Sequence, residues 1–289
     1  MNRHQNINLR QLCICYFLYS TSIKLFTLPS TLAAGSGNFA WLSALFGVLF
    51  ELITVAIACL ILKFTSPGKP FFRVICWLLL PLIAAEICLS GQQIYQMAYT
   101  DLFTDLSLLV FIITLLILGG FMLTQKPRAV FRASEVLWLF FALGLVIAIA
   151  PTLYNLAVDW QQLGQGTFNT VLPTMGSNLL FFEAATFVLA FGSETQKTNQ
   201  QLRRINLTAL LCGLGYVMFM ILFTVLFGPL GQFKTMGLVS LTSAAQCLTN
   251  SGGLDWLIAI AMLCALVLRF GVQLVALVTL LKRGLGRHA

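Results

Sequence analysis

The chain alternates long apolar segments with short polar gaps. About 20 apolar residues at 1.5 Å rise each are enough to cross a bilayer as an α-helix. Apolar segments close to that length occupy residues 9–34, 39–62, 72–98, 105–124, 134–153, 177–197, 205–228 and 254–281. The pattern therefore predicts an all-α polytopic membrane protein with about eight transmembrane helices, folded as a single integral domain over residues 1–289.

Basic residues mark every second gap between these segments. They are Arg3 and Arg10, Lys63, Lys69 and Arg73, Lys126, Arg128 and Arg132, Lys197, Arg203 and Arg204, and Lys282, Arg283 and Arg287. The other gaps contain a single basic residue, Lys234. Short loops rich in Lys and Arg resist translocation and stay cytoplasmic. The alternation therefore predicts that both termini are cytoplasmic.

Composition agrees with this class and narrows the chemistry. The chain is 59% hydrophobic and 9% charged, whereas soluble domains have roughly 25% charged residues. The formal charge of +8 is spread over the predicted cytoplasmic rim, where it favours anionic lipid headgroups rather than nucleic acid. Histidine occurs only at His4 and His288, and no hydrolase, metalloprotease, Walker or dinucleotide motif is present. We therefore expect neither an enzyme nor a bound cofactor or metal.

Two of the apolar segments are interrupted. The first contains several hydroxyl residues, Lys24 and Pro29, and the sixth contains Glu183, Thr186 and Gly192. Irregular backbone at membrane depth is tolerated only where it is buried in protein or lines a wet cavity. Interrupted helices in corresponding positions of two inverted halves point to a transporter's central site. The alternative is that Pro29 is an ordinary kink and Gly192 a packing contact.

Ionisable residues inside the predicted spans are the main candidates for function. They are Lys24, Glu51, Glu86, Glu183 and Arg269, with Glu194 near the end of the sixth span. Each costs a few kcal/mol at the bilayer centre, so they indicate either an interior site or structural ion pairs. Adding nearby hydroxyls gives the candidate ligand-binding set: Ser20, Thr21, Ser22, Lys24, Thr27, Glu86, Glu183, Thr186 and Arg269.

Glu183 is the first candidate, because it lies in the interrupted sixth span. Its carboxylate could receive a ligand ammonium group or take up a proton. Lys24 could pair with a ligand carboxylate or form an ion pair with Glu183. It could also mimic a coupling cation, as a positive charge that is fixed in the protein. Backbone amides at the start of a half-helix suit an α-carboxylate, so an amino acid is a chemically sensible ligand. Gln92, Gln93 and Gln96 either line an external vestibule or form a solvated helix end.

Short motifs resemble a known family. The pairs and runs Leu28-Pro29, Ala33-Ala34-Gly35 and Ala40-Trp41-Leu42-Ser43 resemble a stretch of the endospore germination permeases. These are the B-type subunits of germinant receptors, in the amino acid–polyamine–organocation superfamily. Arg132-Ala133-Ser134-Glu135 resembles that family's Arg-x-x-Glu entry to the fifth span. Asn38-Phe39 stands where the family usually has an aspartate, and the family usually has two more spans.

The resemblance implies a LeuT-like inverted-repeat fold with broken helices 1 and 6, here without the last two spans. It implies a germinant-receptor subunit in the spore inner membrane or cell membrane. Such a subunit binds a small germinant, an amino acid in this hypothesis, and acts in spore germination with A-type and lipoprotein C-type subunits. Two alternatives stay open: a stand-alone proton-coupled amino-acid permease, and a non-transporting membrane assembly subunit.

Overall fold

The computed structural model describes residues 8–65, 69–99, 107–125, 127–155, 163, 168–192, 199–234, 236–249 and 255–286. Within these ranges the chain forms helices and no strand. Some residues used above lie outside them: Arg3, His4, Lys126, Glu194, Lys197, Arg287 and His288.

The helices follow the predicted segments closely. The long ones are α1 (Leu9–Lys24), α3 (Ala40–Phe64), α4 (Pro70–Met97), α5 (Leu108–Thr124), α6 (Pro127–Asn155), α9 (Asn199–Phe227) and α11 (Asp255–Gly284). The short ones are α2 (Leu28–Ser36), η1 (Gly37–Phe39), η4 (Phe168–Thr170), α7 (Val171–Ser177), η5 (Leu179–Phe182), α8 (Ala185–Phe191), η7 (Gly228–Phe233) and α10 (Gly237–Thr249). Each of the eight predicted ranges thus contains helix.

The described helices confirm the all-α membrane class. Five are long and apolar enough to cross a membrane, and a sixth candidate is the bent pair Phe168–Ser177 and Leu179–Phe191. Their outward faces carry large apolar side chains such as Ile53, Leu78 and Met218, which a bilayer accommodates without cost. The chain is therefore an integral membrane protein by length and composition of its helices, while the count of eight crossings stays a prediction.

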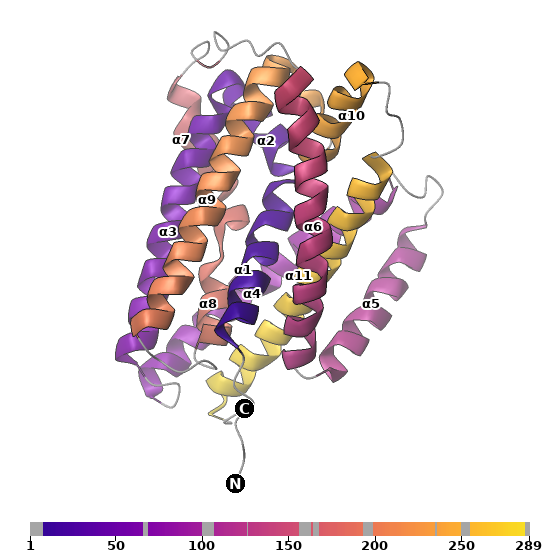
Figure 1. The fold of residues 1–289 in the computed structure, drawn as a ribbon. Coiled ribbons are helices and arrows are strands. Elements are labelled where there is room, and N and C mark those ends of the chain that lie inside the picture. Colours follow the sequence, from indigo (N-terminus) through magenta and orange to yellow (C-terminus); the bar gives the residue numbers. More distant parts are fainter. Residues whose placement is uncertain are drawn as a thin grey trace.

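The long helices form one bundle around α1 (Figure 1). The start of α1 and the end of α11 lie at the same end of the bundle, and α2, α7 and α10 lie at the other. The basic gap residues that the structure describes flank the ends of α3, α4, α6, α9 and α11 at the first of these ends. Helix α5 lies at the periphery, and Gly119 is its buried residue.

Two segments are buried on all sides. Every residue of α8 is buried, from Ala185 to Phe191, and α1 is buried continuously from Leu18 to Lys24. A helix that is enclosed all round belongs to the centre of a bundle. Phe187 of α8 packs against Tyr19 and Tyr16 of α1, with ring centroids 5.1 and 5.8 Å apart. The first and sixth predicted spans therefore meet at the centre of the protein.

The helix between residues 9 and 36 is interrupted at Leu25, Phe26 and Thr27 because of Pro29. Proline has no amide hydrogen and clashes with the carbonyl four residues earlier, which here belongs to Leu25. The freed carbonyls are satisfied by another helix: Gly237 N donates to Phe26 O at 2.8 Å, and Leu238 N donates to Leu25 O at 3.1 Å. These two donors are first amides of α10, which have no partner within their own helix. The interruption and the start of α10 thus satisfy each other.

This contact requires glycine at position 237. A Cβ atom added there would lie 2.6 Å from Pro29 Cγ and 3.1 Å from the Leu25 carbonyl oxygen. A Cβ atom added at Gly215, on an exposed face of α9, would have no neighbouring atom within 4 Å.

We predict that Gly237→Ala displaces α10 and lowers stability by about 1–3 kcal/mol, as overpacking does. The matched control Gly215→Ala should leave stability unchanged or raise it slightly, because alanine is the better helix former. Thermal unfolding of the detergent-solubilised protein checks both. Equal shifts for the two variants would show that α10 does not depend on this close approach.

Candidate functional site

The second interruption separates η5 from α8. Glu183 has φ −93° and ψ 63°, outside the helical region, and the chain bends by 71° between α7 and the segment Leu179–Phe191. The Phe182 ring occupies the space left by Gly47 of α3 and lies 6.2 Å from the Tyr216 ring. At the other end of α8, Arg283 Nη1 donates to the carbonyls of Leu189 and Ala190 at 3.2 and 2.7 Å. This half-helix is therefore fixed at both ends.

One buried cluster surrounds Glu51 of α3. Lys24 of α1 forms an ion pair with the Glu51 carboxylate, and both side chains are almost fully buried. Ser20 Oγ accepts from Lys24 Nζ at 2.7 Å and donates to Glu51 Oε1 at 2.9 Å. Tyr16 OH also donates to Glu51 Oε1, at 3.3 Å. The partner of Lys24 in the structure is thus Glu51 and not Glu183.

A second buried cluster surrounds Glu86 of α4. Tyr19 OH donates to this carboxylate, and so do Thr186 Oγ1 at 3.0 Å and Gln273 Nε2 at 3.3 Å. Arg269 lies with Nη2 4.0 Å from Glu86 Oε2, and its guanidinium carbon is 4.2 Å from the Tyr19 ring centroid. The cluster joins α1, α4, α8 and α11 through one carboxylate.

Glu183 differs from the other two acids. Its carboxylate is half-buried and has no hydrogen-bond or ion-pair partner among the described residues, although its carbonyl accepts from Thr186 Oγ1 at 3.1 Å. The buried and half-buried acids around α1 and α8 are thus Glu51, Glu86 and Glu183, and the buried cations described are Lys24, Arg269 and Arg283, the last of which donates to carbonyls of α8. The ion pairs among the described residues involve Glu51 and Glu86, so the Glu183 carboxylate at the second interruption has no described ion-pair partner.

The remaining candidates have different surroundings. Thr21 Oγ1 donates to the Phe17 carbonyl at 2.6 Å, within its own helix. Ser22 Oγ is buried with no hydrogen-bond partner among the described residues. Thr27, by contrast, accepts a hydrogen bond from Gln93 Nε2 of α4 at 2.8 Å. The structure thus divides the nine predicted residues among two charge clusters, the second interruption, the α1 backbone and a cavity.

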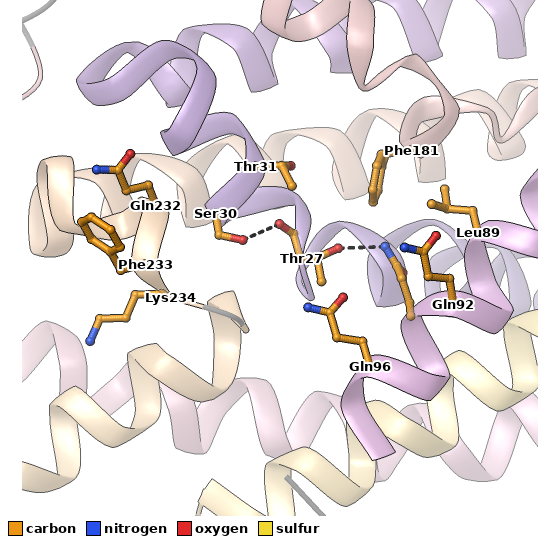
Figure 2. A pocket seen from close by; sticks show the side chains of 11 residues that line it. Thr27, Ser30, Thr31, Leu89, Gln92, Gln96, Phe181, Gln232, Phe233 and Lys234 are labelled. Carbon is orange, nitrogen blue, oxygen red and sulfur yellow. Dashed lines mark hydrogen bonds between the residues drawn. The ribbon is translucent and has the colours of Figure 1, made fainter. Parts of the chain in front are cut away.

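The cavity has a volume of about 320 Å³ and lies beside Thr27 (Figure 2). Its lining includes residues of α2, which lies at the end of the bundle away from the start of α1 (Figure 1). It is bounded by the first interruption at Thr27 and by Phe181 of η5, two residues before the second interruption. Ser30 and Thr31 of α2 line one side, and Leu89, Gln92, Gln93 and Gln96 of α4 line the facing side. Gln232, Phe233 and Lys234, at the end of η7, complete the wall.

Sequence reasoning missed some of these groups. Tyr19 and Gln273 were not among the predicted ligand-binding residues. Gln273 follows Arg269 by four residues and therefore shares its helix face. Ser30 and Phe181, which line the cavity, were not predicted as site residues either. The three glutamines of α4 were identified as a possible vestibule, and all three line the cavity.

In comparisons with known proteins, no protein-family model matches the chain, and no curated protein matches it.

We predict that the carboxylates of Glu51 and Glu183 differ in their importance for stability. Glu51→Gln leaves Lys24 as a buried cation without its counter-charge, so the free energy of unfolding should fall by about 3 kcal/mol. Glu183→Gln removes no described ion pair and should change it by less than about 1 kcal/mol. Thermal or denaturant unfolding in the same detergent compares the two.

The double variant Lys24→Met with Glu51→Leu removes both charges and should recover most of the loss. The account of the Glu51 cluster fails if Glu183→Gln destabilises as strongly as Glu51→Gln.

Proposed function

We propose that this chain is a permease-like membrane protein that binds a small polar solute in the cavity beside its two interrupted helices. The observation that carries the proposal is the position of the cavity, with Thr27 of one interruption and Phe181 next to the other in its wall. Irregular helices at membrane depth form the solute sites of many transporters. The cavity volume also falls within the range of roughly 300–1,000 Å³ that is typical of small-molecule sites.

In this proposal the chain adopts a LeuT-like inverted-repeat fold with eight membrane crossings, and the two broken spans are α1–α2 and α7–α8. Both termini are cytoplasmic, and the cavity opens to the outside. The central position of α1 and α8 supports this arrangement. The short motifs around Pro29 and Trp41 support assignment to the germination permeases. On that assignment the solute is a germinant, and the chain works with A-type and lipoprotein C-type subunits in the spore inner membrane.

A proton-coupled permease that works alone is the second candidate, and Glu183 favours it. A carboxylate at the second interruption with no described counter-charge is a group that can exchange a proton during transport. Solute uptake into vesicles that requires a proton gradient, and that Glu183→Gln abolishes, would support this candidate over a receptor subunit.

We predict that filling the cavity removes solute binding. Ser30 lines the cavity and donates to the Thr27 carbonyl at 2.8 Å, so the ring in Ser30→Phe should occupy the solute's space. Ser177→Phe is the matched control, because the Ser177 hydroxyl makes the same type of bond, to the Thr174 carbonyl at 2.9 Å, on an exposed face of α7.

The measurement is thermal stability of the purified protein across a panel of amino acids, sugars and nucleosides. We expect at least one solute to raise the melting temperature of the wild type and of Ser177→Phe, and to have no effect on Ser30→Phe. Stabilisation that survives in Ser30→Phe would place the binding site elsewhere.

A further inference from the structure

The cavity wall presents hydrogen-bonding groups and one charged side chain. Its wall contains no acidic residue among the described residues, and its one basic residue is Lys234. The Lys234 ammonium lies 5.1 Å from the Phe227 ring centroid, and in Figure 2 it points away from the other lining side chains. What remains is amide, hydroxyl and aromatic surface.

Gln93 is the most informative of these groups. Its side chain is 3% exposed, and its amide nitrogen is used by Thr27. Its amide oxygen is buried with no hydrogen-bond partner among the described residues. A buried acceptor without a donor costs free energy, so an O–H or N–H group brought to this oxygen, by a ligand or by an ordered water, would be stabilising.

Two of the three backbone carbonyls at the first interruption belong to residues that do not line the cavity, Leu25 and Phe26. The carbonyls of Leu25 and Phe26 already accept from the amides of α10. The Thr27 carbonyl accepts from Thr31 N at 3.2 Å and from Ser30 Oγ at 2.8 Å. The ammonium group of a cationic or zwitterionic ligand would therefore be desolvated in the cavity with no acidic lining residue, among the described residues, to pair with it, which is costly.

Resting on the proposed function, we propose that the cavity selects an uncharged polyhydroxy solute of about monosaccharide size. Hydroxyl groups both donate and accept, as do the side-chain amides of glutamine and the hydroxyls of serine and threonine. Gln93 accepts from one ligand hydroxyl, and the glutamines and hydroxyls nearby pair with others. The ring of Phe181 gives apolar surface for a carbon–hydrogen face of a sugar ring. This ligand class replaces the amino acid that the sequence led us to expect.

The test is binding by titration calorimetry in detergent. The uncharged probes are D-glucose, myo-inositol and D-sorbitol, and the charged probes are L-alanine, L-proline and L-lysine. We expect at least one uncharged probe to bind and the charged probes not to bind. Gln93→Met, which keeps the length of the side chain and removes its amide, should weaken that binding about tenfold or more. Gln93→Asn, which keeps an amide but shortens the side chain, should weaken it less.

Gln11→Met is the matched control. Gln11 Nε2 donates to Glu135 Oε2 at 3.0 Å, at the opposite end of the bundle, so its replacement should leave the affinity unchanged. The melting temperature without ligand shows whether each variant is folded.

Different failures separate the two proposals. Binding of L-alanine or L-proline but of no uncharged probe, lost in Ser30→Phe, would overturn the polyhydroxy class and support the solute site. An equal loss of affinity in Gln11→Met and Gln93→Met would overturn the role of Gln93. No binding by any probe in either class would overturn the solute site itself.

Discussion

Groups that a membrane cannot solvate must find partners inside the protein, and this structure depends on how they do so. Pro29 removes the helical partner of the Leu25 carbonyl, and the break in the helix that follows leaves the Phe26 carbonyl to be satisfied from outside as well. In hydrocarbon each unsatisfied carbonyl costs several kcal/mol, so the interruption persists only because α10 supplies the amides of Gly237 and Leu238. One consequence is architectural: α10 is bonded to the interruption, and the end of η7, shortly before α10 in the chain, contributes Gln232, Phe233 and Lys234 to the cavity wall.

Buried charges follow the same rule and fix the helices around α1. The Lys24–Glu51 pair joins α1 to α3, and Glu86 joins α1 to α4, α8 and α11 through Tyr19, Thr186 and Gln273. Arg283 satisfies the last carbonyls of α8. These contacts form a frame that holds α1 and α8 against α3, α4 and α11.

The sequence predicted the helical segments and both interruptions, because apolar length and proline act locally. It also identified the interior charges, since Lys24, Glu51, Glu86 and Arg269 are conspicuous in apolar surroundings. It did not predict their pairing, because pairing depends on how each helix is rotated and on which helices are neighbours. The contact between α10 and Leu25 is a second case: more than 200 residues separate the partners, as their numbers show, and a helix start carries no signal of the carbonyl it will meet.

The central claim is that a cavity beside the two interruptions opens on the side opposite the termini. Labelling of single cysteines with a membrane-impermeant thiol reagent tests it most directly, in right-side-out vesicles and with native cysteines replaced by alanine or serine. Ser30→Cys in the cavity should react in intact vesicles, whereas Gln200→Cys, exposed at the start of α9, should react only after permeabilisation. A Ser30→Cys variant that never reacts, or that reacts from the same side as Gln200→Cys, would contradict the account.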